Sequence, residues 1–213
     1  MLNSSDTTSN VTLAVLAGGA GRRMGGPKSN LLVGGQPALV RLHERLCWEG
    51  PTLLIRAHGG ANPPGAELFD AVAADAVEGQ GPLRGVLTAL ENAVTPMVVV
   101  VPVDMPAIEP SGLRFLIDQL RGSPSKAGMM MCRRVRDVIR FEPFPAVFRR
   151  AAAVTLIRKR IAARELALHR LTESPQMAVR CVPPGLSEQF WTNLNFPDDL
   201  TAYENVLKVG STS

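Results

Sequence analysis

The chain has 213 residues, of which 46% are hydrophobic and 5% aromatic, and its formal net charge is +4. This length and apolar content suit a domain with a substantial core. The few aromatic residues argue against a protein that stacks single-stranded bases, and no groove-reading motif points to a nucleic-acid partner. No apolar run reaches the roughly 20 residues that span a bilayer. The modest positive charge is compatible with an enzyme that has anionic substrates.

The three cysteines, Cys47, Cys132 and Cys181, lie far apart in the sequence, and no C-x-x-C pair occurs. A structural zinc site needs four clustered ligands, so this spacing predicts none. We interpret the thiols as idle groups in a reducing cytoplasm. Residues 1–10 are polar and lack the basic and apolar segments of a secretory signal. We therefore expect a disordered tail at 1–10 and a cytoplasmic protein.

The first part of the chain alternates between two patterns. Short apolar runs predict strands at 12–17, 52–55, 72–74 and 97–101, and apolar residues at helical spacing predict helices at 37–48, 82–93 and 111–122. Ser111 is placed to cap the third helix and Gly122 to end it. Such alternation is typical of a parallel sheet with helices on both faces.

The second part of the chain is less regular. We expect strands at 128–132 and 178–182, a proline-interrupted segment at 141–148, a long basic helix at 151–171 and a last helix at 197–208. No linker divides these segments from the first part, which predicts a single domain over 11–213. The fold class is therefore α/β, with a mostly parallel central sheet.

Residues 16–28, LAGGAGRRMGGPK, follow directly on the first predicted strand, at the end where α/β sheets bind ligands. Glycines let backbone N–H groups approach phosphate oxygens, and Arg23 and Lys28 add positive charge. The run is not a P-loop, because Pro27 precedes the lysine, and not a dinucleotide fingerprint, because Met24 stands at its last glycine position. We interpret it as a triphosphate-binding loop.

Asp104 stands in the run PVDMP, shortly after the strand at 97–101. A buried strand there delivers one carboxylate to the edge of the sheet where an α/β site keeps its metal. Mg²⁺ typically takes one or two carboxylates plus substrate phosphates. A carboxylate in this place is suited to hold a metal, and a capping aspartate in a tight turn is the alternative.

The loop closely resembles the signature Leu-Ala-Gly-Gly-x-x-x-Arg-Met-Gly-x-x-Lys of the molybdenum cofactor guanylyltransferases, the MobA-like nucleotidyltransferase family. The segments GPLRG at 81–85, PVDMP at 102–106 and NLNFPDDL at 193–200 are similar to further motifs of that family, in the same order. The resemblance implies a three-layer, Rossmann-like nucleotidyltransferase fold and Mg²⁺ as cofactor. It also implies transfer of GMP from GTP to molybdopterin with release of pyrophosphate.

The resemblance further implies roles for individual residues. Arg23, Lys28 and Asp104 would be the catalytic set, with Asp104 on the metal and Asp75 near the base. The residues expected to bind the nucleotide are Leu16, Ala17, Gly18, Gly19, Ala20, Gly21, Arg23, Lys28, Asp75, Gly81, Pro82 and Leu83. Residues 11–122 would form the NTP-binding half and residues 123–213 the acceptor-binding half. Asn193 and Asn195 would reach the metal or the phosphates, or only fix a turn.

Several positions depart from the family's pattern. Pro27 stands where members usually carry Asp, and Pro-Lys is seen in relatives that use other nucleotides, which leaves CTP open beside GTP. Gly21 replaces a frequent Ser, and Phe196 replaces a Thr that would cap the last helix, at a cost of about 1 kcal/mol or less. The segment 142–149 only loosely resembles the family's acceptor stretch.

Other functions remain open on these residues. One is a cytidylyltransferase acting on the same pterin or on a sugar phosphate. Another is a non-catalytic protein that binds nucleotide and delivers molybdopterin to a molybdoenzyme or chaperone. The arginines between 149 and 170 would receive an anionic pterin phosphate, or form a solvated basic face over a core stripe. We expect no nucleic-acid and no membrane partner.

Overall fold

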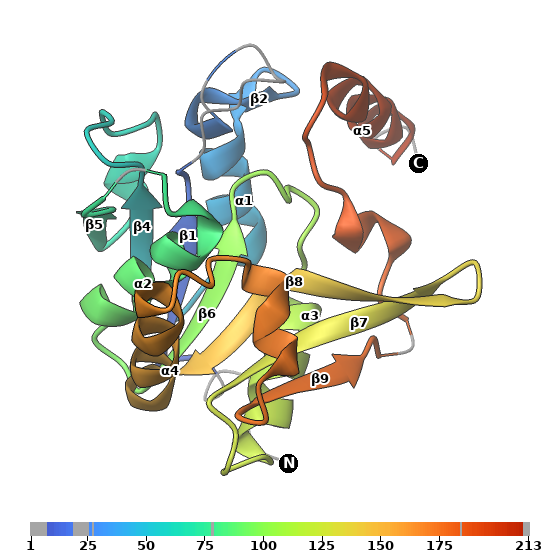
Figure 1. Ribbon diagram of the computed structural model, residues 1–213. Coiled ribbons are helices and arrows are strands. Elements are labelled where there is room, and N and C mark those ends of the chain that lie inside the picture. The colour runs from blue at the N-terminus through green and yellow to red at the C-terminus, as the bar shows by residue number, and fades with distance from the viewer. Residues whose placement is uncertain (1–7, 19–25, 27, 78, 184, 211–213) are drawn as a thin grey trace.

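The described residues fold around a seven-stranded sheet (Figure 1). The computed structural model describes residues 8–18, 26, 28–77, 79–183 and 185–210. From one edge to the other, the strands are β5 (Ala71–Ala74), β4 (Thr52–Arg56), β1 (Val11–Leu16), β6 (Met97–Pro102), β8 (Val138–Arg149), β7 (Gly128–Val135) and β9 (Met177–Cys181). Only β8 in this sheet runs antiparallel to its neighbours. The predicted, mostly parallel sheet is confirmed.

Helices cover both faces of the sheet and complete three layers (Figure 1). Helices α1 (Ala38–Leu46) and α3 (Pro110–Arg121) pack on one face, and α2 (Gly81–Asn92) and α4 (Arg150–Ala162) pack on the other. Because side chains alternate along a strand, β1 buries residues in both cores. This double burial explains why the strands read as continuous apolar runs. The three-layer α/β fold predicted from the sequence is confirmed.

Two further elements stand beyond the carboxyl ends of the parallel strands, at the top of Figure 1. They are the hairpin of β2 (Leu32–Val33) with β3 (Gln36–Pro37), and helix α5 (Pro197–Gly210). The backbone N–H of Gly34 donates to Glu204 Oε1 at 2.8 Å, which joins the hairpin to α5. Parts of the chain 170 residues apart therefore frame the same edge of the sheet.

The predicted basic helix over 151–171 is wrong in its length. Helix α4 ends at Ala162, and a separate 3₁₀ helix, η4, covers Leu168–Glu173. Between them Arg164 adopts a left-handed conformation with φ 60°, and the N–H of Glu165 donates back to the Arg160 carbonyl at 2.9 Å. This backbone reversal at the end of α4 has no glycine or proline to signal it in the sequence.

The proline-interrupted segment proves to be part of the long strand β8. The register between β7 and β8 shifts at Met130 and Met131, which pair with Ala146 and Glu142 respectively. Residues 143–145 are therefore bulged out of the ladder. At these positions the lack of an N–H group in Pro143 and Pro145 costs no hydrogen bond between the strands. The bulge explains how a strand in the middle of the sheet tolerates two prolines.

Two segment boundaries also differ from expectation. The N-cap of α3 is Glu109, with Pro110 in the first turn, so the predicted Ser111 cap is wrong, although the helix does end at Gly122. Residues 8–10 form a turn in which Thr8 is buried, so the expected tail does not include them.

The halves expected at 11–122 and 123–213 share one sheet, since β8 pairs with β6. None of the described helices is long and apolar enough to cross a bilayer.

A buried pair of threonines should matter for stability. Thr95 Oγ1 accepts from the Thr12 N–H at 2.8 Å, lies 2.7 Å from the Thr12 hydroxyl oxygen, and donates to the Met97 carbonyl at 2.7 Å. Thr95→Val keeps the volume but leaves these buried groups unpaired, so we expect a loss of about 1–3 kcal/mol in unfolding free energy by urea titration. Thr201→Val, at an exposed hydroxyl on α5, is the control and should change little. Equal stability of both variants would contradict the assigned role.

Candidate functional site

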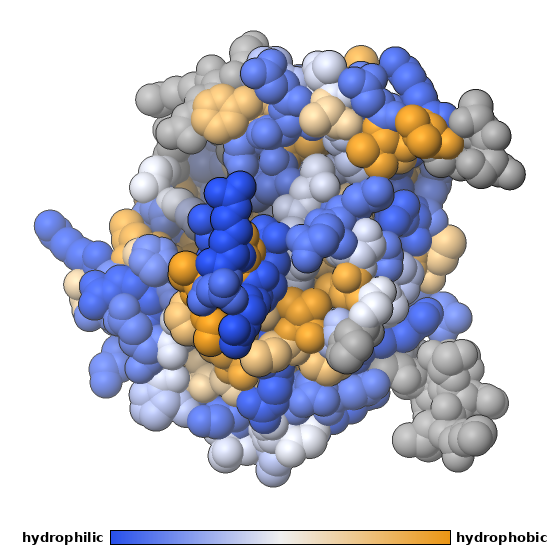
Figure 2. Space-filling model, turned by 90° about the vertical axis from the view of Figure 1, so that its right-hand side faces the viewer, coloured by the Kyte–Doolittle hydropathy of each residue, from blue (hydrophilic) through white to orange (hydrophobic). Residues whose placement is uncertain are grey.

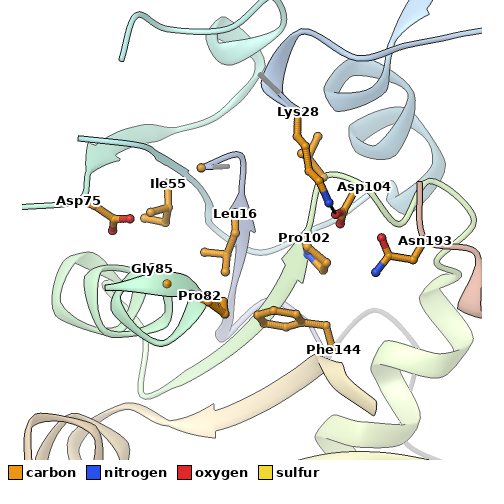
Figure 3. Close-up of a pocket in the computed structure, with 13 residues that line it drawn as sticks. Leu16, Lys28, Ile55, Asp75, Pro82, Gly85, Pro102, Asp104, Phe144 and Asn193 are labelled. Atoms are coloured by element: carbon orange, nitrogen blue, oxygen red, sulfur yellow. Dashed lines mark hydrogen bonds and ion pairs between the residues drawn. The ribbon is translucent and has the colours of Figure 1, made fainter. Parts of the chain in front are cut away.

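A cavity of about 350 Å³ opens at the carboxyl ends of β1, β4 and β6 (Figure 3). The strand ends form its floor, and the first turn of α2 forms one wall. Its lining residues are Leu16, Gly18, Lys28, Ile55, Asp75, Gly81, Pro82, Gly85, Pro102, Val103, Asp104, Phe144 and Asn193. Open α/β sheets bind their ligands at this edge, and a cavity of this size suits a small molecule.

A polar cluster from three distant segments lies on one side of this cavity (Figure 3). The Nζ of Lys28 donates to Oδ2 of Asp104 and, at 2.7 Å, to Oδ1 of Asn195. The N–H of Leu194 donates to the main-chain carbonyl of Asp104 at 2.8 Å. These bonds hold the segment before α5 against the loop after β6.

Local structure fixes each member of the cluster. The N–H of Val103 donates to the Leu16 carbonyl at 3.0 Å, which continues the β1–β6 ladder up to Asp104. At the other segment, Asp199 Oδ2 accepts from the N–H groups of Asn195 at 2.9 Å and Phe196 at 2.8 Å. Asp199, in the first turn of α5, therefore binds the main chain just before the helix. Phe196 has no side-chain oxygen that could cap the helix, as the sequence indicates.

The site fits a hard divalent cation. Asp104 is 7% exposed, and its Oδ1 is buried without a hydrogen-bond partner among the described residues. Leaving a buried carboxylate oxygen unpaired is unfavourable, so this atom is suited to a ligand from outside the chain. Carboxylate and amide oxygens are ligands for Mg²⁺, and Asn193 lies beside Asp104 on the same wall (Figure 3).

The described residues contain no cluster of three or more His, Cys, Asp or Glu side chains that could enclose a metal. Mg²⁺ is usually held by one or two carboxylates and completes its shell with waters and substrate phosphates. The donor set at Asp104 is of this open kind, so a cation there would be shared with the ligand.

Asp75 lies on the opposite side of the cavity from Lys28 and Asp104, with Leu16 between them (Figure 3). Thr88 Oγ1 donates to Asp75 Oδ1 at 2.7 Å. A β-carbon at Gly85 would lie 3.4 Å from Leu16 Cδ2 and 3.9 Å from Asp75 Oδ2. The glycine therefore leaves room for a ligand beside the carboxylate. Burial raises the pKa of the Asp75 carboxyl above its ordinary value, although the Thr88 hydrogen bond acts in the opposite direction.

The structure brings most of the predicted site residues together but separates two of them. Ala17 and Leu83 are buried and do not line the cavity; Ala17 donates its N–H to Ile55, and Leu83 packs in the core beneath α2. Gly81 does line the cavity, and its φ of 66° lies in the left-handed region that favours glycine. The predictions for Gly19, Ala20, Gly21 and Arg23 lie outside the described residues.

Sequence reasoning missed the apolar part of the lining. Ile55, Pro102 and Phe144 face the cavity at the ends of strands or in the β8 bulge. In the sequence such residues cannot be told from core residues. Only the proline-rich stretch around Phe144 was a signal, because it marked an irregular backbone.

A second cavity, of about 680 Å³, adjoins the first and shares Phe144 and Asn193 with it. Arg133 lines it and is held at 2.8 Å from Glu142 and 3.2 Å from Glu188, beneath the Trp191 ring. Its remaining lining residues are Met105, Arg140, Phe141, Pro143, His169, Thr172 and Glu173. The two cavities together offer adjoining sites for two ligands.

The arginines of α4 do not reach either cavity. Arg158 pairs with Glu91 at 2.9 Å, and Arg150 Nε donates to the Leu90 carbonyl at 3.0 Å, so both bind α2. Leu156 and Ile157 of the same helix are buried in the core. The interpretation of this helix as a basic face over a core stripe is the one that the contacts support.

The fold is that of the Rossmann-like nucleotidyltransferases. Molybdopterin-guanine dinucleotide biosynthesis protein A from Archaeoglobus fulgidus superposes with a TM-score of 0.74 at 21% identity, covering 92% of this chain and 98% of the other. Residues 13–178 match the MobA-like NTP transferase domain. The chain therefore belongs to the MobA-like NTP transferase family.

Relatives of known designation agree with this family. A probable molybdenum cofactor guanylyltransferase from Chloroflexus aggregans is 31% identical over 198 residues, which cover 87% of this chain and 89% of the relative. A molybdenum cofactor guanylyltransferase from Sinorhizobium fredii is 39% identical over 115 residues, covering 50% of this chain and 51% of the relative.

The buried carboxylate of Asp75 should lower stability at neutral pH. Because its pKa is raised in the folded state, folding is favoured below the ordinary pKa and loses that contribution as the pH rises through the folded value. Asp75→Asn retains an acceptor for Thr88 without the charge. We expect its melting temperature to exceed that of the unmodified chain at pH 7 by about 1–2 °C, and this difference to vanish near pH 3.5. Asp137→Asn, at an exposed turn carboxylate, is the control. A lower melting temperature for Asp75→Asn at pH 7 would refute this reading.

Proposed function

We propose that this protein transfers GMP from GTP to molybdopterin and releases pyrophosphate, with Mg²⁺ as cofactor. The observation that carries the proposal is the cluster of Lys28, Asp104 and Asn195 at the carboxyl edge of the sheet. The ammonium group of Lys28 suits a triphosphate, and the buried carboxylate of Asp104, with one unpaired oxygen, suits the metal bound to that triphosphate. The designations of the relatives supply the nucleotide and the acceptor.

The two sides of the first cavity suit the two ends of a nucleotide. In this proposal the triphosphate lies at Lys28 and Asp104, and the base lies toward Asp75, on the other side of Leu16. Guanine presents a ring N–H and an amino group side by side, and one carboxylate accepts both. Cytosine offers its amino group beside acceptors, so Asp75 favours GTP.

The second cavity suits the acceptor, because it adjoins the first at Phe144 and Asn193. Arg133 and Arg140 line this cavity, and Arg133 would exchange a glutamate partner for the phosphate of a pterin. An acceptor phosphate oxygen would then attack the α-phosphorus of GTP in line, and pyrophosphate would leave toward Lys28. A bound Mg²⁺ supplies charge neutralisation for the leaving group. Asp104 and the two asparagines would hold that ion, while Lys28 binds the released phosphates. This reaction needs positioning and electrostatics, and no side-chain nucleophile.

In the structure Lys28 pairs with Asp104 directly. On binding of a metal–nucleotide complex, the ammonium group would exchange Asp104 for a phosphate oxygen and free the carboxylate. The pair therefore neutralises a buried charge until the substrate replaces it.

The nucleotide should be tested first. Pyrophosphate release is measured with GTP, CTP, ATP and UTP, each with Mg²⁺ and molybdopterin. We expect release with GTP, at least tenfold faster than with CTP. Release with CTP alone would assign the protein to the cytidylyl branch and give Pro27 a role in that choice. Binding without release, for any nucleotide, would favour a delivery protein.

Asp104→Asn should separate catalysis from binding. The change preserves shape but removes the charge at the metal site, so we expect turnover to fall at least 100-fold and the Mg²⁺ concentration for half-maximal rate to rise. GTP affinity measured without metal should change by less than threefold. Asp118→Asn, on the exposed side of α3, is the matched control and should retain full activity. Full activity of Asp104→Asn would exclude Asp104 as the metal ligand.

A further inference from the structure

Two of the three cysteines, 49 residues apart in the sequence, are neighbours in the sheet. Cys132 of β7 and Cys181 of β9 are directly paired in the parallel register, and their sulfur atoms lie 3.9 Å apart. Side chains of paired residues project to the same face, and neighbouring strands are separated by about 4.8 Å. Disulfides span Cα–Cα distances of about 4.4–6.8 Å, so the backbone spacing already suits a bond.

We propose that Cys132 and Cys181 form a reversible disulfide in response to peroxide, and that this bond alters the neighbouring second cavity. The two thiols differ in their exposure to solvent, and the two steps of such a reaction need this difference. Cys181 is exposed at the end of the edge strand, whereas Cys132 is buried behind it. An oxidant therefore meets Cys181 first, and Cys132 is in position to resolve the product.

The reaction balances with hydrogen peroxide as the oxidant. The Cys181 thiol loses its proton, its sulfur attacks one peroxide oxygen, and the O–O bond breaks to give a sulfenic acid and hydroxide. The hydroxide takes up the proton that the thiol released and leaves as water. The sulfur of Cys132 then attacks that of Cys181 and displaces hydroxide, which takes the Cys132 proton and leaves as water. Two thiols and one peroxide give one disulfide and two waters. Burial raises the pKa of the Cys132 thiol, which disfavours Cys132 as the thiolate that first reacts with peroxide.

The pair is connected to the second cavity on both strands. Arg133, which lines that cavity, follows Cys132 directly. On the other strand, the N–H of Val182 donates to the Cys132 carbonyl at 3.1 Å, and the chain then leads to the 3₁₀ helix η5 (Glu188–Trp191). Arg133 contacts both Glu188 and Trp191. A bond between the sulfurs, at about 2.05 Å, draws these two segments together. Figure 2 shows the molecule from the right-hand side of Figure 1, the side on which the end of the β7–β8 hairpin and helix α5 lie.

The test uses Cys47→Ser protein, which retains only the pair; Cys47 is exposed and lies on α1's end. After treatment with hydrogen peroxide, we expect thiol titration under denaturing conditions to fall from two thiols to none. The monomer should lose two hydrogens in mass, a peptide linking positions 132 and 181 should appear, and dithiothreitol should restore both thiols. Bond formation should be at least tenfold faster in folded than in urea-unfolded protein.

The double variant Cys47→Ser, Cys181→Ser keeps only the buried thiol, and it should show no intramolecular bond and much slower oxidation. Persistence of both thiols in Cys47→Ser, or oxidation of Cys181 to sulfinic acid with Cys132 still free, would overturn the proposal. These readouts need no turnover, so their failure is distinguishable from failure of the proposed function.

The effect on the second cavity rests on the proposed function. We expect the disulfide to change the KM for molybdopterin at least threefold, with the Kd for GTP changed less than twofold, and dithiothreitol to reverse the effect. The same peroxide treatment of the double variant is the control. A disulfide that leaves the KM for molybdopterin unchanged would overturn the link to the second cavity.

Discussion

The parallel pairing of β1 with β4 and β6 is the constraint on which the site depends. Parallel strands end at the same edge, so the loops that follow them meet there although they are distant in the sequence. The β1–β6 ladder continues through the bond from Val103 to Leu16, which places Asp104 over the end of β1. Asp104 and the base of the cavity are thus positioned by one set of main-chain bonds. Side-chain contacts, such as that between Lys28 and Asp104, are added to this main-chain arrangement.

The site also carries features that do not favour stability. A buried oxygen of Asp104 lacks a partner among the described residues, and the Asp75 carboxyl is buried with a raised pKa. Unpaired or poorly solvated polar groups of this kind weaken a fold, and they gather where a ligand completes them. Because both of these carboxylates line the same cavity, they are a stronger indication of binding than the cavity's volume. The Lys28–Asp104 pair offsets part of this penalty while the substrate is absent.

The sequence predicted the regular part of the fold well, because the strands are buried on both faces and the first helices are amphipathic. It also predicted the location of Lys28 and Asp104 at one edge of the sheet, because each follows closely on a predicted strand. It did not predict features that depend on distant pairing. The bulge around Pro143 is such a feature, because it depends on the pairing of β8 with β7. The end of α4 was missed for a local reason, since its left-handed residue is Arg164 and not a glycine. The apolar lining of the cavity was missed for a related reason, since Phe144 reads as core.

The cysteine pair likewise could not be predicted from the sequence. Spacing in the sequence described Cys132 and Cys181 as unrelated thiols, because motif rules detect only ligands that are close along the chain. The crossover that brings β9 beside β7 is what makes them neighbours. Their location differs from that of the nucleotide cluster in one important respect. Lys28 and Asp104 depend on the central strands, whereas the pair lies at the edge of the sheet, where fewer contacts oppose a small movement. A bond formed there can shift the second cavity while the packed strands beneath the first cavity keep their positions, so redox state would act on acceptor binding and leave nucleotide binding intact.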